Sequence, residues 1–144
     1  MKIVLQRVNS ARVEVDGKIV GSIAKGYVAY LGIGTCDTKE TADKLVDKIV
    51  RLRIFKDENG KTNLSAGDVG GEIIVISQFT LMADISSNRP NFSSGAKPEM
   101  AKELYEYFVE YCRSKFVKIA TGQFGAYMQV FSDGDGPFTL VLEG

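Results

Sequence analysis

The stretch from Ile73 to Ile76 constrains the fold more than any other part of the chain. All of its residues are apolar and β-branched, as expected of a strand that is covered on both faces. At the end of this strand Ser77, Gln78 and Thr80 introduce hydroxyl and amide groups, and each must find a partner or cost stability. Polar groups in this position indicate either a satisfied structural network or a functional site.

Further strands are predicted before and after this run. Residues 2–15 alternate in their second half, and Asp16-Gly17 is a hairpin signal that leads into the run KIVGSI. Other strand-like runs follow Gly26 and occupy the tail of the chain. The predicted strands beyond the first hairpin are 27–34, 72–81, 117–122, 126–131 and 138–143, with a turn in SDGDGP between the last two.

Two helices are predicted to pack on these strands. Apolar residues recur at helical spacing from about 38 to 52, after Asp37 and Glu40, which resemble a capping box. Pro98 suits the first turn of a second helix. No repeat, linker or composition break divides the chain. The sequence therefore predicts one α+β domain over residues 1–144, with a mostly antiparallel, barrel-like β-sheet and two packed helices.

Composition narrows the class of protein. A chain of 144 residues that is 44% hydrophobic can form one domain with a real core. No apolar run approaches the roughly 20 residues that a membrane span needs, and the start MKIVLQRVNS lacks the long apolar centre of a signal peptide. We therefore expect a cytoplasmic protein with no membrane partner. Cys36 and Cys112 lie far apart without a CxxC pair, which favours neither a disulfide framework nor a zinc site. Cys112 falls on the apolar face of the second helix.

Charge and histidine content set sharper limits on function. The 18 Lys and Arg residues balance 18 Asp and Glu residues, so no global basic charge attracts nucleic acid. The chain has no His. This removes Ser-His-Asp and Cys-His catalysis, HExxH zinc chemistry and any imidazole general base. An enzyme with this sequence works without histidine.

The segment from Ser77 to Thr80 has two interpretations on its residues alone. In an extended strand Gln78 and Thr80 point to one face, and Ser77 and Phe79 point to the other. Backbone N–H groups left unpaired at a strand end could bind an oxyanion beside these hydroxyls. The simpler interpretation, which the residues alone favour, is that Ser and Thr hydroxyls cap a loose strand end.

Other residues leave similar alternatives open. Gly136-Pro137 could form a cis peptide that lets a second group approach the backbone, or it could lie in an ordinary hairpin turn. Arg7, on the first strand, could face solvent or could brace the carbonyl groups of a neighbouring turn with its five donors. Three apolar residues could wall a pocket or belong to the core: Phe92, Phe124 and Met128.

The order of several short motifs identifies a family. The chain reads QRV near its start, then DVGGE…SQFTL, an NRPNF loop, TGQFGAYMQV and a terminal DGPFT. This combination resembles the D-aminoacyl-tRNA deacylase family, which includes the D-tyrosyl-tRNA(Tyr) deacylases. The resemblance runs from Met1 to about Glu143, and SQFT is its most specific element.

The resemblance implies a homodimeric, cytoplasmic hydrolase that needs no metal or cofactor. Its partner is aminoacyl-tRNA, and it cleaves the ester between a D-amino acid or glycine and the 3′-terminal adenosine. Glycine mischarged on tRNA(Ala) is one expected substrate. The residues that match the family's SQFT motif, which holds the adenosine and the ester, are Ser77, Gln78, Phe79 and Thr80. Gly136 and Pro137 match a Gly-cisPro motif that is inserted across the dimer to reject L-amino acids, and Arg7 matches the residue that braces it.

One departure from the family and two rival functions complete these expectations. Gly134 stands where the family usually has Asn, whose side chain can bond its own backbone in a turn. We expect the ribose 2′-hydroxyl to assist water, because no base for a Thr80 nucleophile is evident. The rivals are a non-catalytic module that binds RNA 3′ ends, supported only by Gly134, and a small-molecule esterase with Thr80 as nucleophile.

Overall fold

The computed structural model describes residues 1–144, and its centre is one strongly curved sheet. β8 runs along one edge of β1 for almost the whole length of that strand, while β3 and β2 divide the other edge. β6 follows β3, and β7 follows β6. The strands are β1 (Lys2–Val15), β2 (Lys18–Ile23), β3 (Gly26–Gly32), β6 (Glu72–Ser77), β7 (Ile119–Thr121) and β8 (Gln129–Glu143).

The hairpin between β1 and β2 confirms the prediction from Asp16 and Gly17. These residues have φ angles of +50° and +76°, and two successive positive φ angles are what a two-residue hairpin turn of type I′ needs. β2 then curls toward β7 at the far end of the sheet. A Cβ added to Gly21 would lie 2.2 Å from the carbonyl oxygen of Thr121. The sheet is therefore nearly closed, which confirms the expected barrel-like core.

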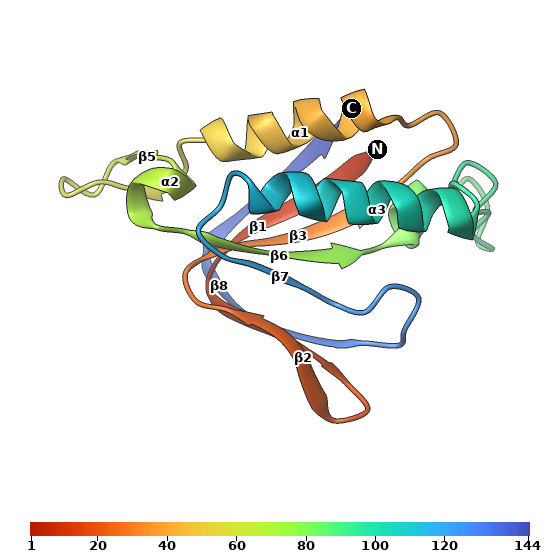
Figure 1. The fold of residues 1–144 in the computed structure, drawn as a ribbon, viewed down its shortest axis with the longest axis horizontal. Helices are drawn as coiled ribbons and strands as arrows, with labels where there is room; N and C mark the ends of the chain where they lie inside the picture. The colour runs from red at the N-terminus through yellow and green to blue at the C-terminus, as the bar shows by residue number, and fades with distance from the viewer.

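The sheet is mixed, with more parallel pairing than the sequence indicates. β1 is antiparallel to β2, β3 and β8, whereas β6 is parallel to both β3 and β7. Parallel neighbours need a crossover connection. α1 (Lys39–Arg51) lies in the crossover between β3 and β6, and α3 (Pro98–Arg113) lies in the one between β6 and β7. Figure 1 shows both helices on the same face of the sheet.

The two predicted helices are present, and one detail of the first is corrected. Its capping box is formed by Thr38 and Thr41, not by Asp37 and Glu40. α3 begins at Pro98, as predicted. The structure adds a four-residue helix, α2 (Ala66–Val69), and a small hairpin of β4 (Phe55–Lys56) and β5 (Thr62–Leu64). None of the helices is long and apolar enough to cross a membrane.

Hydrophobic residues pack on both faces of β6, as the opening run predicts. Ile73 and Val75 belong to the larger cluster, between the sheet and the helices. Ile74 and Ile76 belong to a second cluster inside the curl of the sheet. All four are at least 98% buried, with relative exposures of 0–2%. The polar residues after Ile76 therefore lie at the end of a fully covered strand.

The predicted turn in SDGDGP is wrong. β8 is one continuous strand, and the segment Asp135–Phe138 forms a large bulge within it. Gln6 pairs with Thr139 and Val8 pairs with Gly134, so four residues of β8 stand opposite Arg7 alone. Asp, Gly and Pro are frequent both in turns and at bulges, and only the pairing with β1 distinguishes the two.

Burial of Cys112 predicts an alkaline limit to stability. Burial raises the pKa of this thiol from 9.0 to about 12, so the folded chain keeps a proton that the unfolded chain loses above about pH 9. The free energy of unfolding should therefore fall as the pH rises from 9, by about 1.4 kcal/mol per pH unit for this group. Urea unfolding of wild type and Cys112→Val between pH 7.5 and 11 measures this. The variant should begin to lose stability only near pH 10, where unfolded tyrosines ionise; equal slopes from pH 9 to 10 would contradict the assignment.

Candidate active site

The chain changes conformation at the end of β6. The strand stops at Ser77, and residues Phe79–Met82 form a 3₁₀ turn, η1. The prediction of an extended strand to residue 81, with Gln78 and Thr80 on one face, is therefore wrong. The Gln78 N–H donates to the carbonyl of Leu31 at 2.8 Å, which is the last bond between β6 and the neighbouring strand β3 before the chain leaves the sheet.

This turn leaves backbone donors free at its start. No side chain caps η1, and its first bonded N–H is that of Leu81, which donates to the Gln78 carbonyl at 3.2 Å. The N–H groups of Phe79 and Thr80 thus have no partner within the turn. The Gln78 side-chain amide donates to the Thr80 hydroxyl. Several hydrogen-bond donors therefore lie together at the end of a buried strand.

A cavity of about 590 Å³ opens beside this turn, within the range of ~300–1,000 Å³ that is usual for small-ligand sites. It includes Ser77, Gln78 and Phe79 from the predicted motif, together with all three predicted wall residues; Thr80 lies outside the lining. The lining residues are Leu31, Ile33, Ile76, Ser77, Gln78, Phe79, Phe92, Gly95, Ala96, Pro98, Ala101, Phe124, Gly125, Ala126, Tyr127, Met128 and Val130.

The lining carries no carboxylate, amine, guanidinium or thiol. Its polar side chains are those of Ser77 and Gln78, with the exposed phenol of Tyr127 at the edge. Such a cavity suits an uncharged, largely aromatic ligand that is oriented by a few hydrogen bonds. It also offers no side chain that could act as a general base near neutral pH.

The far wall of the cavity is held by the core. The Phe124 ring packs on Tyr105 with ring centroids 5.5 Å apart. The Tyr105 hydroxyl donates to the Val75 carbonyl at 2.8 Å, and burial raises its pKa to about 12. A Cβ on Gly122 would lie 2.5 Å from the Met128 sulfur, so only glycine allows Met128 to fold back against the wall.

Arg7 lies in a different place from this cavity and braces the β8 bulge. Its side chain is 5% exposed, and its Nε lies 3.1 Å from the Asp135 carboxylate and 3.3 Å from the Asp135 carbonyl oxygen. Its Nη1 donates to the carbonyl of Ile54, and its guanidinium carbon lies 4.8 Å from the centre of the Phe138 ring. Of the two alternatives for Arg7, bracing a neighbouring segment is the one present.

The bulge itself is shaped around glycine. Gly136 has a φ of +124°, and the Gly136-Pro137 peptide is cis. A Cβ on Gly136 would lie 3.2 Å from Arg7 Nη2 and 3.0 Å from the Phe138 nitrogen. Gly136 and Pro137 are both exposed, and neither lines the cavity of their own chain. Within one chain, the predicted site residues at the end of β6 and those in the β8 bulge therefore lie at separate places.

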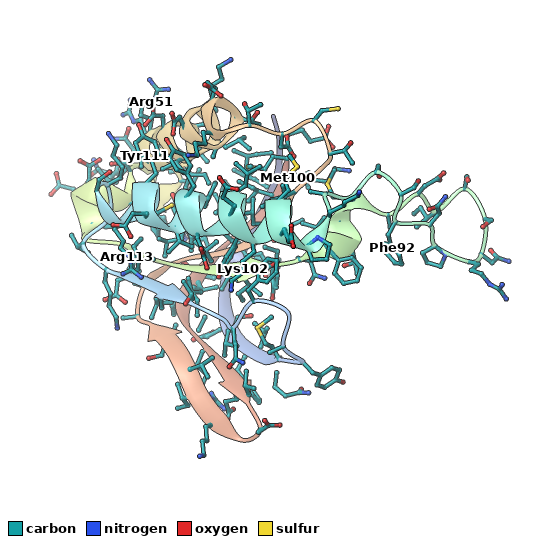
Figure 2. The ribbon with its side chains drawn as sticks, turned by 45° about the vertical axis from the view of Figure 1, so that its right-hand side comes forward. Arg51, Phe92, Met100, Lys102, Tyr111 and Arg113 are labelled. Atoms are coloured by element: carbon teal, nitrogen blue, oxygen red, sulfur yellow. The ribbon has the colours of Figure 1, made fainter.

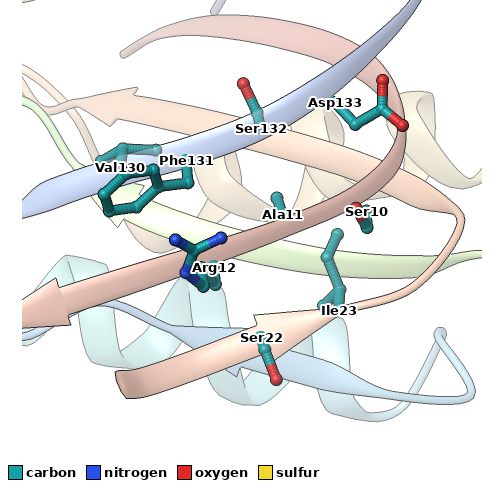
Figure 3. Close-up of a pocket in the computed structure, with 9 residues that line it drawn as sticks. All are labelled: Ser10, Ala11, Arg12, Ser22, Ile23, Val130, Phe131, Ser132 and Asp133. Carbon is teal, nitrogen blue, oxygen red and sulfur yellow. The ribbon is translucent and has the colours of Figure 1, made fainter. Parts of the chain in front are cut away.

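A second depression, of about 670 Å³, lies on the sheet between β2, β1 and β8. Figure 3 shows Arg12 beside Phe131 at its centre, and the guanidinium carbon is 3.9 Å from the ring centroid. Ser10, Ser22 and Asp133 complete its polar edge. It contains none of the predicted site residues.

Sequence reasoning missed the part of the cavity that comes from other segments. Gly95, Ala96, Pro98 and Ala101 line it from the loop before α3 and from the first turn of α3. Small residues carry little chemical signal by themselves. The one available signal was the NRPNF motif, which places this loop among the matching segments.

Comparison with known proteins gives the same family over the whole chain. The family model D-Tyr-tRNA(Tyr) deacylase matches residues 4–143. A D-aminoacyl-tRNA deacylase from Thermosipho melanesiensis is 53% identical over 99% of this chain and 97% of its own. One from Aquifex aeolicus is 49% identical with the same coverage.

Solved structures agree with this fold. A c-Myc DNA unwinding element binding protein matches with a TM-score of 0.95 and 41% identity, over 100% of this chain and 99% of its own. A probable eukaryotic D-amino acid tRNA deacylase matches with a TM-score of 0.86 and 16% identity, over 98% and 97%, which shows the shared fold. The family model and the curated relatives place the chain among the deacylases, which are hydrolases of acyl bonds. The chain belongs to the D-Tyr-tRNA(Tyr) deacylase family.

Proposed function

We propose that the protein hydrolyses the ester that joins a D-amino acid to the 3′-terminal adenosine of tRNA, releasing the free D-amino acid and the tRNA. The observation that carries this proposal is the uncharged cavity beside the free N–H groups of Phe79 and Thr80. An ester is already an activated acyl group. Its hydrolysis therefore depends mainly on donors for the developing oxyanion.

The proton of the attacking water goes, in this proposal, to a group of the substrate. The ribose 2′-hydroxyl lies next to the ester, and holding it in place makes its assistance intramolecular. Thr80 is a weaker candidate for a nucleophile. Its hydroxyl already accepts a hydrogen bond from Gln78. To act as a nucleophile it would also have to give its proton to a base, and the cavity lining contains none.

The remaining lining residues fit the adenosine. Phe124 and Met128 form an apolar wall, against which a nucleobase can pack, as bases do on aromatic side chains in single-stranded RNA sites. Ser77 and Gln78 supply hydrogen-bonding groups in the same cavity. We assign adenosine to this wall and the ester to the segment Ser77–Thr80.

Discrimination between enantiomers is assigned to the β8 bulge of a second chain. The bulge is exposed, is braced from behind by Arg7 and carries no side chain at Gly136. Its backbone carbonyls could occupy the space that an L side chain needs, and such a clash is how a site rejects a near-identical substrate. Glycine has no side chain to clash, so glycyl-tRNA, including glycine mischarged on tRNA(Ala), should also be cleaved.

This arrangement requires a C2 homodimer, because the bulge does not reach the cavity of its own chain. Supporting this assembly, β8 exposes Phe131 by 42% and Val141 by 64% on either side of the bulge, and large exposed apolar side chains favour burial in an interface. A fully active monomer in analytical ultracentrifugation would contradict it. We place the reaction in the cytoplasm, where aminoacyl-tRNA is made and used.

Three substrates separate this proposal from its rivals. We expect release of D-tyrosine from D-tyrosyl-tRNA, at least 100-fold slower release from L-tyrosyl-tRNA, and no comparable cleavage of D-tyrosine ethyl ester, which lacks the ribose. An RNA-binding module would release nothing, and a Thr80 esterase would cleave the ethyl ester equally well. Binding of duplex DNA is not favoured, because 18 acidic residues balance 18 basic ones.

A further inference from the structure

Two aromatic rings stand exposed at the mouth of the cavity. Phe79 and Phe92 both line it, yet they are 61% and 40% exposed to solvent. Their ring centroids are 5.1 Å apart with an interplanar angle of 60°. Side chains that line a cavity and also face solvent form its rim. These rings come from separate segments, the turn η1 and the loop before α3, so the pair is built by the fold.

The loop that carries Phe92 is pinned on both sides of this residue. Asp84 and Asn91 exchange backbone hydrogen bonds of 2.7 and 2.9 Å, and the Gly95 N–H donates to the Phe92 carbonyl at 3.0 Å. The Ser93 N–H donates to the Asn91 side chain at 2.9 Å. Figure 2 shows Phe92 beyond the N-terminal end of α3, where this loop leaves the body of the molecule. Phe92 is thus exposed and held in place, as a binding platform needs.

We propose that the Phe79–Phe92 pair is a nucleobase subsite, and that the base it takes is that of the nucleotide preceding the terminal adenosine. This inference rests on the proposed function, in which the adenosine fills the cavity. The 3′ end of tRNA is a single strand, so the chain of the RNA must leave through the mouth of the cavity. The first base outside then meets the rim, where exposed aromatic rings stack on bases of any sequence.

The balance of charge supports stacking as the means of holding the strand. With equal numbers of acidic and basic residues, the protein gains little from general attraction to phosphates. Stacking on a ring needs no net charge. Tyr127, which is 88% exposed, also lines the cavity, but no ring packs against it, whereas Phe79 and Phe92 fix one another.

The test compares three minimal substrates that end in the same D-tyrosyl adenosine. The first is D-tyrosyl-adenosine alone, the second is D-tyrosyl-CpA, and the third replaces the cytidine of CpA by an abasic riboside. For wild type we expect kcat/KM to rise about tenfold or more from the first to the second, mostly through KM, in line with the stacking of one base. The abasic substrate should resemble the first, because it keeps the phosphate and lacks the base.

Variants then locate the subsite by the size of this gain. Phe92→Ala and Phe92→Leu should reduce the gain to twofold or less, and Phe92→Tyr should restore it. Ile85→Ala is the matched control, since Ile85 is 76% exposed on the same loop and does not line the cavity; it should keep the wild-type gain. Circular dichroism and thermal unfolding confirm that each variant is folded.

Several results would overturn the inference. A wild-type enzyme that gains nothing from the cytidine has no such subsite, and an equal gain from the abasic substrate assigns the effect to the phosphate. If Tyr127→Ala loses the gain and Phe92→Ala keeps it, the preceding nucleotide of the RNA stacks on Tyr127 and not on the Phe79–Phe92 pair. If D-tyrosyl-tRNA itself is not cleaved, the proposed function fails, which is a separate outcome from loss of the gain.

Discussion

A D-tyrosyl-tRNA that ends in 2′-deoxyadenosine should be hydrolysed at least 100-fold more slowly than the normal substrate, with its binding little changed. The cavity lining has no ionisable group suited to act as a base near neutral pH, and general base catalysis is typically worth 10²–10⁴-fold. The neighbouring hydroxyl of the ribose is the group that can supply it. Single-turnover rates with excess enzyme measure the chemical step, and competition by the uncharged 2′-deoxy tRNA measures binding.

Thr80→Val is the comparison that separates the two mechanisms. Valine keeps the shape of threonine but removes the hydroxyl that accepts from the Gln78 amide. In the substrate-assisted mechanism this loss disturbs the position of Gln78, and we expect a fall of about tenfold or less in the single-turnover rate. A loss as large as that of the 2′-deoxy substrate, or a trapped acyl-Thr80, would establish Thr80 as the nucleophile.

The parts of the fold that the sequence predicts are those with a local cause. Asp16 and Gly17 favour the type I′ turn by themselves. The apolar residues of α1 recur at helical spacing because they form its one buried face. The run Ile73–Ile76 is apolar throughout because both of its faces are covered. In each case the information lies within a few residues.

The parts that the sequence does not predict depend on distant partners. Residues 132–137 have the composition of a turn, yet residues 132–134 pair with β1, and residues 135–138 form a bulge because β1 pairs on both sides of them. The chain leaves the sheet after Gln78, whose N–H makes the last bond to β3, at Leu31, far back in the sequence. The cavity has the same character, since its walls come from η1, the loop before α3 and the segment before β8. From the sequence, only the resemblance to a family indicates that those segments belong to one site.

Arg7→Ala should lower the ratio of D- to L-tyrosyl-tRNA cleavage by about tenfold or more. The substitution leaves the Asp135 carbonyl and carboxylate and the Ile54 carbonyl without their donor, and unfolding should become easier by about 1–3 kcal/mol. A bulge without its brace can move, and its carbonyls then no longer exclude an L side chain. The rates on both enantiomers are measured at a temperature where the variant is folded.

Two further variants show whether Arg7 acts through the bulge or through the fold as a whole. Arg7→Lys keeps the charge but not the planar fork, so one ammonium cannot reach the same acceptors; we expect partial loss of discrimination. Lys2→Ala is the matched control, because Lys2 is on the same strand and also pairs with a carboxylate of β8, that of Glu143, but lies away from the bulge. It should keep the wild-type ratio of D to L cleavage.

Gly134→Asn tests the same filter in the opposite direction. Gly134 pairs with Val8 at the edge of the bulge, and a Cβ added there meets no atom within 4 Å, so the larger side chain has room. Asn can bond its own backbone near a turn, which should stiffen the bulge, leave the rate on D-tyrosyl-tRNA similar and slow the cleavage of L-tyrosyl-tRNA. If Arg7→Ala instead lowers both rates in proportion and Gly134→Asn changes neither, the bulge is a structural feature of β8, and the enantiomers must be distinguished by the cavity itself.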